Sequence, residues 1–310
     1  MLEMDVVIVG GGAAGLAAAM MLGRSRRQVT LLDAGEPRNA PSAHLHGFPS
    51  RDGADPAELV KIGKEEARAY GAEIREVRVS GLEHADGGGF AVHLDDGGAL
   101  TARAVVVATG LRDELPEIPG LRERWGHDVL HCPYCHGYEA RDTALAVIGG
   151  DNRPFTLHQA QLVRQWSDDV VFFPHHITLT DDERHRLVAR GVRIVEGEVA
   201  RVVAEDDAVS AVELADGRIV PRAAVFVGPR FVPQDELLTS LGCAADDNGW
   251  VRVDPSGQTS VPGVWAAGNV SDSPAQLVNA AAAGSKAAIA LNHHLLADDI
   301  DRAVAKHDAS

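Results

Sequence analysis

The sequence contains few cysteines, and their placement limits what they can do. Only three cysteines occur among 310 residues, and two of them, Cys132 and Cys135, stand in one Cys-x-x-Cys motif. A chain that relied on a disulfide framework would carry more cysteines at wider spacings. This usage is typical of a reducing compartment, where a disulfide is catalytic rather than structural. We therefore expect a cytoplasmic protein.

The sequence also lacks the segments that direct a chain to membranes or to nucleic acids. The first residues, Met1–Asp5, carry acidic side chains and no basic region, so we expect no signal peptide. Glycine or charged residues interrupt the apolar runs well short of a membrane span. The formal net charge is −16, whereas nucleic acids and anionic membranes require basic surfaces. These features predict that neither is a partner.

What is present is the composition of a globular protein. Hydrophobic residues make up 45% of the chain and charged residues 24%, which is ordinary for a folded domain surrounded by water. A length of 310 residues is long for one hydrophobic core. The length therefore predicts two domains of usual size.

The N-terminal segment carries a dinucleotide-binding pattern. The apolar, β-branched run Asp5–Val9 predicts a buried parallel strand, and a helix-forming stretch follows the glycines. Between them, Gly10 allows a tight turn, Gly12 lets the backbone approach a pyrophosphate, and Gly15 lets the helix pack on the strand. A second strand ends in Asp33, 18 positions after Gly15, where a carboxylate can bind both hydroxyls of an adenosine ribose. Together these signals disfavour a chance glycine turn.

The remaining pattern alternates strands and helices, which is typical of an α/β protein. The charged, proline-bearing segment 111–126 predicts a crossing between domains, and 228–243 predicts the return. The acidic end, 298–310, is expected to be a frayed surface helix or a tail. Helices are expected at 57–70, 155–166, 181–190 and from 276 towards 296, and Thr180 is expected to cap the third of these. Strands are expected at 74–79, 90–94, 105–110, 144–148, 170–173, 192–195, 199–203, 209–214, 223–227 and 262–270.

The segment His131–Gly137, near the middle of the chain, carries the most reactive side chains. Its Cys-x-x-Cys spacing closes a small disulfide ring easily, and Pro133 suits the first turn of a following helix. Helix amides and a flanking imidazolium both favour the thiolate, which is the reactive form of cysteine. We therefore predict a redox-active pair, Cys132 and Cys135, with His136 as a candidate base for the thiols.

Two other interpretations of this motif compete with redox function. A zinc site would need His131 or His136 as ligands, because no second Cys-x-x-Cys motif exists and Cys243 is far away in sequence. A structural disulfide is the second alternative. Neither is favoured, and no metal site is predicted. His136 has the further alternative of capping a helix or binding a backbone group, and Cys243 is expected to be a small buried residue.

Taken in order, the motifs resemble a known family over nearly the whole chain. A glycine-rich N-terminal turn precedes Ala-Thr-Gly at 108–110, the central Cys-x-x-Cys, a second βαβ pattern and Val-Pro-Gly-Val-Trp-Ala-Ala-Gly at 261–268. This order resembles the low-molecular-weight thioredoxin reductases. The stretch Cys-Pro-Tyr-Cys-His-Gly-Tyr-Glu looks more like one branch, the FAD-dependent dithiol oxidases that close disulfides in natural products such as gliotoxin and holomycin.

The resemblance implies a fold, a cofactor and an assembly. The fold would be α/β, with two Rossmann-like, three-layer (ββα) nucleotide-binding domains of which the first is discontinuous in sequence. Residues 1–114 and 241–310 would form the FAD-binding domain. Residues 115–240 would form an NAD(P)H-like domain that carries the redox motif. Members of this family are usually homodimers, so a homodimer is expected.

Position by position, the resemblance also implies a cofactor site. Cys135 would be the thiol next to the flavin, and Cys132 the interchange thiol that meets the substrate. Asn269 would reach the ribityl or phosphate region, and Gln276 and Ala282 would lie near the isoalloxazine. The implied FAD-binding residues are Gly10, Gly12, Ala14, Gly15, Asp33, Ala34, Asn39, His46, Ala108, Thr109, Gly110, Gly268, Asn269, Gln276, Leu277 and Ala282.

Three departures from the family pattern are evident, and two of them bear on a second nucleotide. Asn269 replaces the usual aspartate of Ala-Ala-Gly-Asp, and the turn 149–154 lacks a full GxGxxG/A pattern. His175 and His176 follow the strand at 170–173, where NADPH-dependent members carry arginines for the 2′-phosphate. No acid stands there, so NADH is not favoured either. The sequence therefore predicts bound FAD and a doubtful NADP(H) site.

These residues predict an FAD-dependent thiol–disulfide oxidoreductase. The preferred hypothesis is oxidation of a dithiol to a disulfide, with dioxygen as the electron acceptor. The alternative is the opposite electron flow, from NADPH or ferredoxin to a disulfide, as in thioredoxin reductases. A flavin-binding sensor or scaffold without turnover is a third hypothesis, which the two cysteines disfavour. The partner is expected to be a small dithiol or a thioredoxin-like protein.

Overall fold

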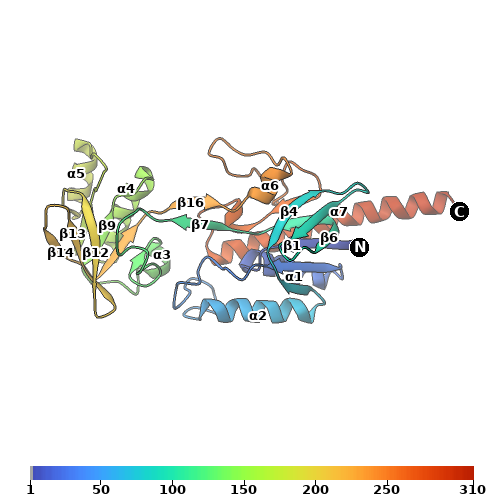
Figure 1. Ribbon diagram of the computed structural model, residues 1–310, viewed down its shortest axis with the longest axis horizontal. Helices are drawn as coiled ribbons and strands as arrows, with labels where there is room; N and C mark the ends of the chain where they lie inside the picture. The colour runs from blue at the N-terminus through green and yellow to red at the C-terminus, as the bar shows by residue number, and fades with distance from the viewer. Residues whose placement is uncertain (1–2) are drawn as a thin grey trace.

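The computed structural model describes residues 3–310, and for Glu3 it describes the backbone only. Met1 and Leu2, on which part of the expectation about a signal peptide rests, lie outside the described residues. The chain forms two bodies joined by a pair of strands (Figure 1). Within residues 3–310, no helix has both the length and the apolar character needed to cross a bilayer.

The first domain is built on a seven-stranded sheet in the order β3-β2-β1-β6-β5-β4, with β17 beside β6. β6 joins two layers, because its first half pairs antiparallel with β5 and its second half pairs parallel with β17. The polar turn between β5 and β6 forms the hairpin. The strands are β1 (Glu3–Val9), β2 (Val29–Asp33), β3 (Glu73–Glu76), β4 (Val79–His84), β5 (Phe90–Leu94), β6 (Ala99–Val107) and β17 (Val264–Ala266).

Three helices cover one face of this sheet: α1 (Ala13–Arg24), α2 (Pro56–Ala69) and α7 (Leu277–Asp308). Alanines and glycines fill the contact between α1 and α7, so the two backbones approach closely. A Cβ atom on Gly284 would lie 1.9 Å from the carbonyl oxygen of Ala14. The opposite face packs against a second apolar cluster that includes residues of the short helix α6 (Glu236–Ser240).

The second domain repeats the parallel arrangement on a smaller scale. Its five-stranded sheet has the order β11-β10-β9-β15-β8 and is flanked by helices α4 (Arg153–Leu162) and α5 (Asp181–Ala189). Thr180 and Glu183 form a capping box that starts α5, as the predicted cap at Thr180 requires. The strands are β8 (Val129–Leu130), β9 (Leu145–Ile148), β10 (Val170–Phe173), β11 (Arg193–Ile194) and β15 (Ala224–Val227), with a separate antiparallel layer of β12 (Val199–Glu205), β13 (Ala208–Leu214) and β14 (Ile219–Pro221).

Two short antiparallel strands, β7 (Leu111–Glu114) and β16 (Arg230–Pro233), run between the two bodies (Figure 1). They lie in the two segments where the sequence predicts crossings. The predicted fold class is confirmed: two Rossmann-like domains, with the first completed by β17 and α7 from the end of the chain. The limits 1–114 with 241–310, and 115–240, stay a prediction.

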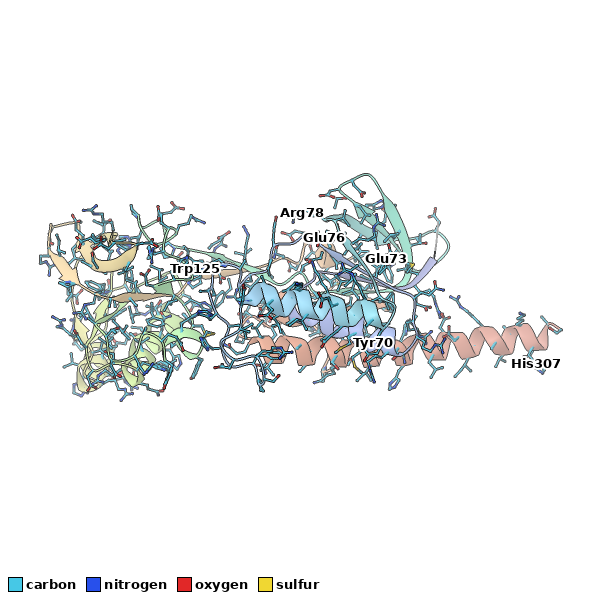
Figure 2. All side chains as sticks on the ribbon, turned by 90° about the horizontal axis from the view of Figure 1, so that it is seen from below. Tyr70, Glu73, Glu76, Arg78, Trp125 and His307 are labelled. Carbon is cyan, nitrogen blue, oxygen red and sulfur yellow. A yellow bond between two sulfur atoms is a disulfide. The ribbon has the colours of Figure 1, made fainter. Side chains whose placement is uncertain are left out.

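The end of the chain is a surface helix, one of the two forms expected for residues 298–310, and it continues the preceding helix without a break. α7 is one helix from Leu277 to Asp308, and Figure 2 shows His307 at its outer end, beyond the body of the domain. Ion pairs fix the second half of α7 to the domain, because Arg103 lies 2.6 Å from the carboxylates of both Asp298 and Asp299. Arg27 binds Asp299 as well, also at 2.6 Å. Single-sequence periodicity could not show these partners, which come from distant parts of the chain.

Candidate active site

One large cavity, with a volume of about 1000 Å³, lies between the two domains. The carboxyl ends of β1, β2 and β6 open into it, as do the first turns of α1 and α7 and the Cys-x-x-Cys segment. It brings together Cys132, Cys135, His136 and most of the predicted cofactor residues, namely Gly10, Gly12, Ala14, Asp33, Ala34, Asn39, His46, Ala108, Thr109, Gly110, Gly268, Asn269, Gln276 and Leu277.

The glycine turn after β1 has the shape that a pyrophosphate needs. Gly10 has φ +109°, and a Cβ there would lie 2.3 Å from the carbonyl oxygen of Ala108. A Cβ on Gly15 would lie 1.8 Å from the carbonyl oxygen of Gly10, so helix and strand pack as predicted. Gly12 faces open space, with no atom within 4 Å of a Cβ, and caps α1 without any side-chain hydrogen bond. Free helix amides beside an open glycine form a cradle for phosphate.

Asp33 is held at the cavity by two groups, one of which the sequence did not indicate. Its Oδ1 accepts a hydrogen bond from the backbone N–H of Gly35 at 3.1 Å. Its Oδ2 lies 2.7 Å from Nζ of Lys64, on α2. Burial lowers the pKa of Lys64, but Asp33 and Glu76 raise it more, so the pKa is raised overall. On a solvent-facing amphipathic helix, Lys64 could not be distinguished from other surface lysines by pattern.

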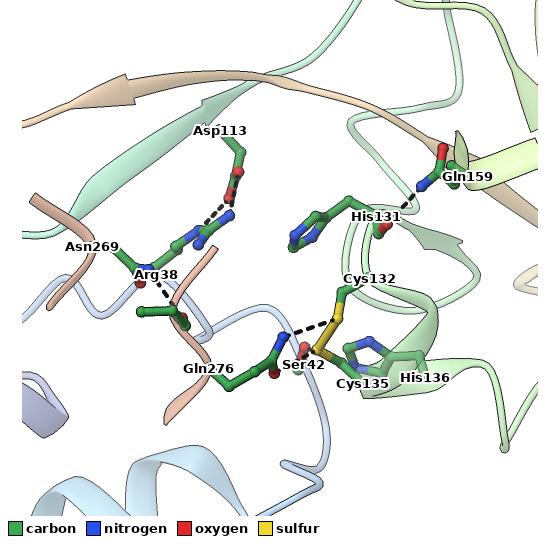
Figure 3. The surroundings of a disulfide bond; sticks show 11 residues. Arg38, Ser42, Asp113, His131, Cys132, Cys135, His136, Gln159, Asn269 and Gln276 are labelled. Carbon is green, nitrogen blue, oxygen red and sulfur yellow. Dashed lines mark hydrogen bonds and ion pairs between the residues drawn. A yellow bond between two sulfur atoms is a disulfide. The ribbon is translucent and has the colours of Figure 1, made fainter. Parts of the chain in front are cut away.

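The two cysteines form a disulfide at the junction of the domains (Figure 3). Cys132 precedes the short helix α3 (Pro133–His136), and the Cα atoms of the pair are 5.3 Å apart. Gln276 contacts both sulfurs: its Nε2 donates to Sγ of Cys132 at 3.5 Å, and its Oε1 lies 3.2 Å from Sγ of Cys135. Gln276 is also the N-cap of the 32-residue helix α7, which has no side-chain cap. The positive end of that helix dipole therefore lies beside the sulfurs and favours a thiolate.

His136 ends α3 and contacts the first domain. Its Nε2 lies 3.3 Å from Oγ of Ser42 (Figure 3). Burial lowers the pKa of His136; Glu139 opposes this effect and His46 adds to it. His46 itself lies 3.5 Å from Oε1 of Glu139, so it connects the loop after β2 to the second domain. A neutral His136 beside the disulfide can accept a proton from a thiol.

His131 lies just before the pair and is packed among rings. Its ring stacks on Trp125 at a centroid distance of 6.0 Å and meets the edge of Phe231 at 5.7 Å. Nε2 of Gln159 donates to the His131 carbonyl oxygen at 2.6 Å, which fixes the backbone entering the motif. Burial lowers the pKa of His131 to about 4, and the positive charge of Arg38 contributes.

This low pKa predicts a loss of stability in acid. Between pH 6.5 and about 4 the unfolded chain binds a proton at residue 131 and the folded chain does not, so folding is disfavoured as the pH falls. Lowering the pH from 7 to 5 is expected to reduce the free energy of unfolding through His131 by about 1–2 kcal/mol, allowing for its partial exposure. Urea titrations should show a smaller pH dependence for His131→Phe, which keeps a ring. His185→Gln, at an exposed histidine on α5, should match the wild type; identical pH dependence in all three proteins would contradict the assignment.

Among the implied cofactor residues, Asn269 and Thr109 line the cavity but also hold nearby loops, whereas Ala282 lies away from it. Nδ2 of Asn269 donates to the carbonyl oxygens of three loop residues at 3.0–3.2 Å, so the amide nitrogen closes the loop before α7. Thr109 likewise binds the carbonyl oxygen of Gln234 at 2.5 Å, next to β16. Ala282 is exposed on α7 and does not line the cavity, because the buried stripe of the helix passes through Ala280 and Gly284 instead.

In the second nucleotide turn, residues 149–154, the protein's own groups take up the hydrogen bonds and the space that a pyrophosphate would need. Oδ1 of Asn152 accepts from the backbone N–H of Phe155 at 3.2 Å and so caps α4, and Pro154 has no N–H to offer. A Cβ on Gly149 would lie 2.1 Å from the carbonyl oxygen of Pro174, so this glycine serves packing. Oδ1 of Asn152 thus stands where a phosphate oxygen would accept hydrogen bonds.

The histidines after β10 are also poor partners for a 2′-phosphate. Nδ1 of His175 accepts a hydrogen bond from the backbone N–H of Val199 at 2.9 Å. Burial and the neighbouring His176, whose ring centroid is 3.7 Å away, lower the pKa of His175. A neutral imidazole with one nitrogen engaged lacks the fixed charge and paired donors of arginine.

Two smaller points concern the third cysteine and metals. Cys243 is a free, buried thiol beside Thr259, as expected for a small core residue. Among the side chains of residues 4–310, no group of three or more histidine, cysteine or acidic side chains is placed to hold a metal ion.

A family model described as pyridine nucleotide-disulphide oxidoreductase matches residues 4–284. The chain belongs to this family. It is therefore an oxidoreductase of a flavoprotein family, and the resemblance to low-molecular-weight thioredoxin reductases that the sequence indicates is confirmed. The match runs from β1 through the second domain and β17 to the first turns of α7.

Individual named proteins are similar to this chain over nearly its full length. Thioredoxin reductase sirT of Leptosphaeria maculans is 28% identical and covers 96% of this chain and 95% of its own. Among solved structures, HlmI is 54% identical, covers 99% of this chain and 97% of its own, and has a TM-score of 0.95. A putative thioredoxin reductase, TrxB of Bacillus anthracis, is 32% identical with 96% and 99% coverage and a TM-score of 0.91.

Proposed function

We propose that this chain is an FAD-dependent enzyme that oxidises a dithiol to a disulfide with dioxygen. The observation that carries the proposal is the position of the Cys132–Cys135 disulfide, which faces the cavity shared by the two domains and contacts the N-cap of α7. The self-capped second nucleotide turn supports the direction of electron flow, because it offers NADPH little to bind. The resemblance of Cys-Pro-Tyr-Cys-His to the dithiol oxidase branch agrees with both features.

The residues of the first domain fit FAD. The open face at Gly12 and the free amides of α1 would hold the pyrophosphate, and Asp33 would hold the adenosine ribose. Gln276 and Leu277, at the start of α7, would meet the part of the cofactor nearest the sulfurs. The chemistry that FAD supplies when bound is two-electron oxidation of the cysteine pair, with dioxygen as final acceptor and hydrogen peroxide as product.

The cysteines perform thiol–disulfide exchange. A substrate thiolate attacks Sγ of Cys132; a mixed disulfide forms, the Cys132–Cys135 bond breaks, and Cys135 leaves as a thiolate. The second substrate thiol then attacks the substrate sulfur of the mixed disulfide, and Cys132 leaves as a thiolate. The substrate departs as a disulfide, having given two electrons and the proton of its second thiol to the enzyme; its first proton left when the attacking thiolate formed. The start of α7 stabilises the thiolates, and His136 accepts a proton.

The alternative is a reductase that passes electrons from NADPH or ferredoxin to a protein disulfide. The names of several relatives, such as thioredoxin reductase sirT, favour it. The two functions differ in what reduces the enzyme. We expect dithiothreitol to bleach the flavin absorbance of the holoenzyme without oxygen, and air to restore it with formation of peroxide. Fast bleaching by micromolar NADPH in a stopped-flow instrument, with no oxygen consumption on dithiols, would support the reductase instead.

The role of His136 predicts the acid side of the pH profile. The group works as a neutral base, so its contribution is present above its pKa and is lost below it. Because burial lowers that pKa beneath 6.5, the contribution of His136 to kcat/KM for a dithiol should be lost only below pH 6.5. His136→Asn is expected to lower kcat/KM about a hundredfold and to remove this limb. His185→Asn should preserve both; a limb that persists in His136→Asn would assign the base elsewhere.

The remaining expectations concern the setting of the enzyme. We infer a homodimer in a reducing compartment such as the cytoplasm, acting on a small dithiol or on a thioredoxin-like protein. The net charge of −16 supports a role without nucleic acid or anionic membranes. Light scattering of the holoenzyme tests the dimer directly.

A further inference from the structure

Lys64 places a positive charge at the end of the cavity where the proposed function puts the adenosine ribose. It lies on α2, and it lines the cavity together with Asp33 and Gly11 of the glycine turn. Its side chain is only 13% exposed. Burial acts to lower the pKa of Lys64, but Asp33 and Glu76 raise it above its usual value, so the ammonium is charged at neutral pH. A largely buried charge is stable only with a partner, and the nearest partner of Lys64 is Asp33.

The carboxylate of Asp33 is held by three contacts. Its Oδ1 accepts from the backbone N–H of Gly35 at 3.1 Å, and its Oδ2 lies 2.7 Å from Nζ of Lys64. A Cβ atom on Gly11 would lie 2.4 Å from Oδ2, so the carboxylate rests against the backbone of the glycine turn. A carboxylate can accept about four hydrogen bonds, and Gly35 and Lys64 occupy two of these sites. The remaining sites can bind the two hydroxyls of a ribose.

The charge at this end of the cavity depends on Lys64. Asp33 and Glu36 both line it, and a pyrophosphate bound at the glycine turn would bring further negative charge. Arg78 also lines it, but this arginine pairs with Glu36 at 2.7 Å. Glu76, the second partner of Lys64, lies 3.4 Å away and is 75% exposed, so water screens it. Without Lys64, the buried carboxylate of Asp33 would stand beside the phosphate cradle with its charge uncompensated.

We propose that Lys64 is a positioning residue for FAD that acts through Asp33: it balances the charge of the carboxylate and holds it in place for the ribose hydroxyls. This inference rests on the proposed function and adds to its cofactor site a residue that lies outside the glycine motif. If Lys64 only stabilised α2, its removal would cost the same whatever residue stands at position 33. If it acts through Asp33, its removal costs FAD affinity only while the carboxylate is present.

Titration of the apoprotein with FAD, followed by flavin fluorescence, measures this dependence. Lys64→Met removes the charge and keeps an unbranched chain, and Lys64→Gln keeps a donor without the charge. Each is expected to raise the dissociation constant for FAD about tenfold, whereas Lys64→Arg should stay within about threefold. In the Asp33→Asn background, Lys64→Met should change the dissociation constant less than about twofold. Lys61→Met is the matched control, since Lys61 is an exposed lysine on the same helix that does not line the cavity.

ADP shows which end of the cofactor Lys64 serves. ADP shares the adenosine and the pyrophosphate with FAD but has no flavin. Lys64→Met should therefore weaken ADP binding, measured by calorimetry on the apoprotein, by the same factor as FAD binding. A loss with FAD but not with ADP would place the effect at the flavin and overturn the inference.

The outcomes separate this inference from the proposed function. Equal losses from Lys64→Met with Asp33 and with Asn at position 33 would mean that the lysine supports the fold, and would overturn the inference. Unchanged FAD affinity in both Lys64→Met and Lys64→Gln would overturn it as well. In each case FAD binding and dithiol oxidation by the wild type would leave the proposed function intact. A wild-type apoprotein that takes up no FAD would refute the proposed function, and the role of Lys64 with it.

Discussion

Replacing either Cys132 or Cys135 with serine is expected to abolish dithiol oxidation while FAD stays bound. A serine hydroxyl cannot form the mixed disulfide or re-form the enzyme disulfide, so both sulfurs are required in every turnover. We expect oxygen consumption on dithiothreitol to fall at least about a thousandfold in each variant, as when a nucleophile is removed from other enzymes. The flavin spectrum of the purified variants should match that of the wild type.

Cys243→Ser is the control for this pair. Cys243 is a buried free thiol next to Thr259, away from the cavity, so its loss should leave turnover unchanged. The same experiment decides the third hypothesis, a flavin-binding sensor or scaffold. Oxygen consumption that survives in both Cys132→Ser and Cys135→Ser would remove the disulfide from the reaction and revive that hypothesis.

Gly284→Val is expected to have the largest effect on stability and cofactor binding. The Cβ atom that valine adds would lie 1.9 Å from the carbonyl oxygen of Ala14, a backbone atom in the first turn of α1. One of the two helices must move, and overpacking of this kind costs about 3 kcal/mol or more in the free energy of unfolding. Because the same turn of α1 forms the phosphate cradle, FAD affinity should fall together with stability.

Lys286→Val provides the matched comparison, since it puts the same side chain on an exposed position of α7 two residues further on. Lys286→Val should lower the free energy of unfolding by less than about 1 kcal/mol, the intrinsic cost of valine in a helix, because this position makes no contact with α1. Urea unfolding and fluorescence titration of the apoprotein with FAD measure the two effects. A Gly284→Val protein as stable as Lys286→Val, with normal FAD affinity, would show that the helices tolerate separation.

Local signals explain what the sequence could predict. The glycine turn, Asp33 and the Cys-x-x-Cys motif each combine a fixed spacing with a conformational need, and all are placed at one cavity. The capped start of α5 at Thr180 and the run of β10 were predicted to the residue for the same reason. A buried strand of four consecutive apolar residues and a Thr-x-x-Glu cap can each be recognised within a few positions of the sequence.

Contacts between distant segments explain what it could not. Lys64 reaches Asp33 from another helix, and Arg38 reaches Asp113 from another loop, with nothing in either segment to indicate the partner. The ring contacts among Trp125, His131, Phe231 and Phe155 join three separate segments, so no single window of sequence contains them. The short strands β7, β8, β14 and β16 have two to four residues each, too few for an alternating pattern to show. Ala282 was placed by family analogy alone, and the structure puts it on the exposed side of α7.

The discontinuity of the first domain has a consequence for synthesis on the ribosome. β17 pairs with β6, and α7 packs on α1, yet both are translated after the whole second domain. Domains usually fold in the order in which they emerge. Here the inserted second domain can complete its core first, whereas β6 and α1 still lack β17 and α7, which are made later. The first turn of α1 reaches its final shape only when Gly284 meets Ala14, so the nascent chain should acquire its cofactor only after Gly284 has left the ribosome.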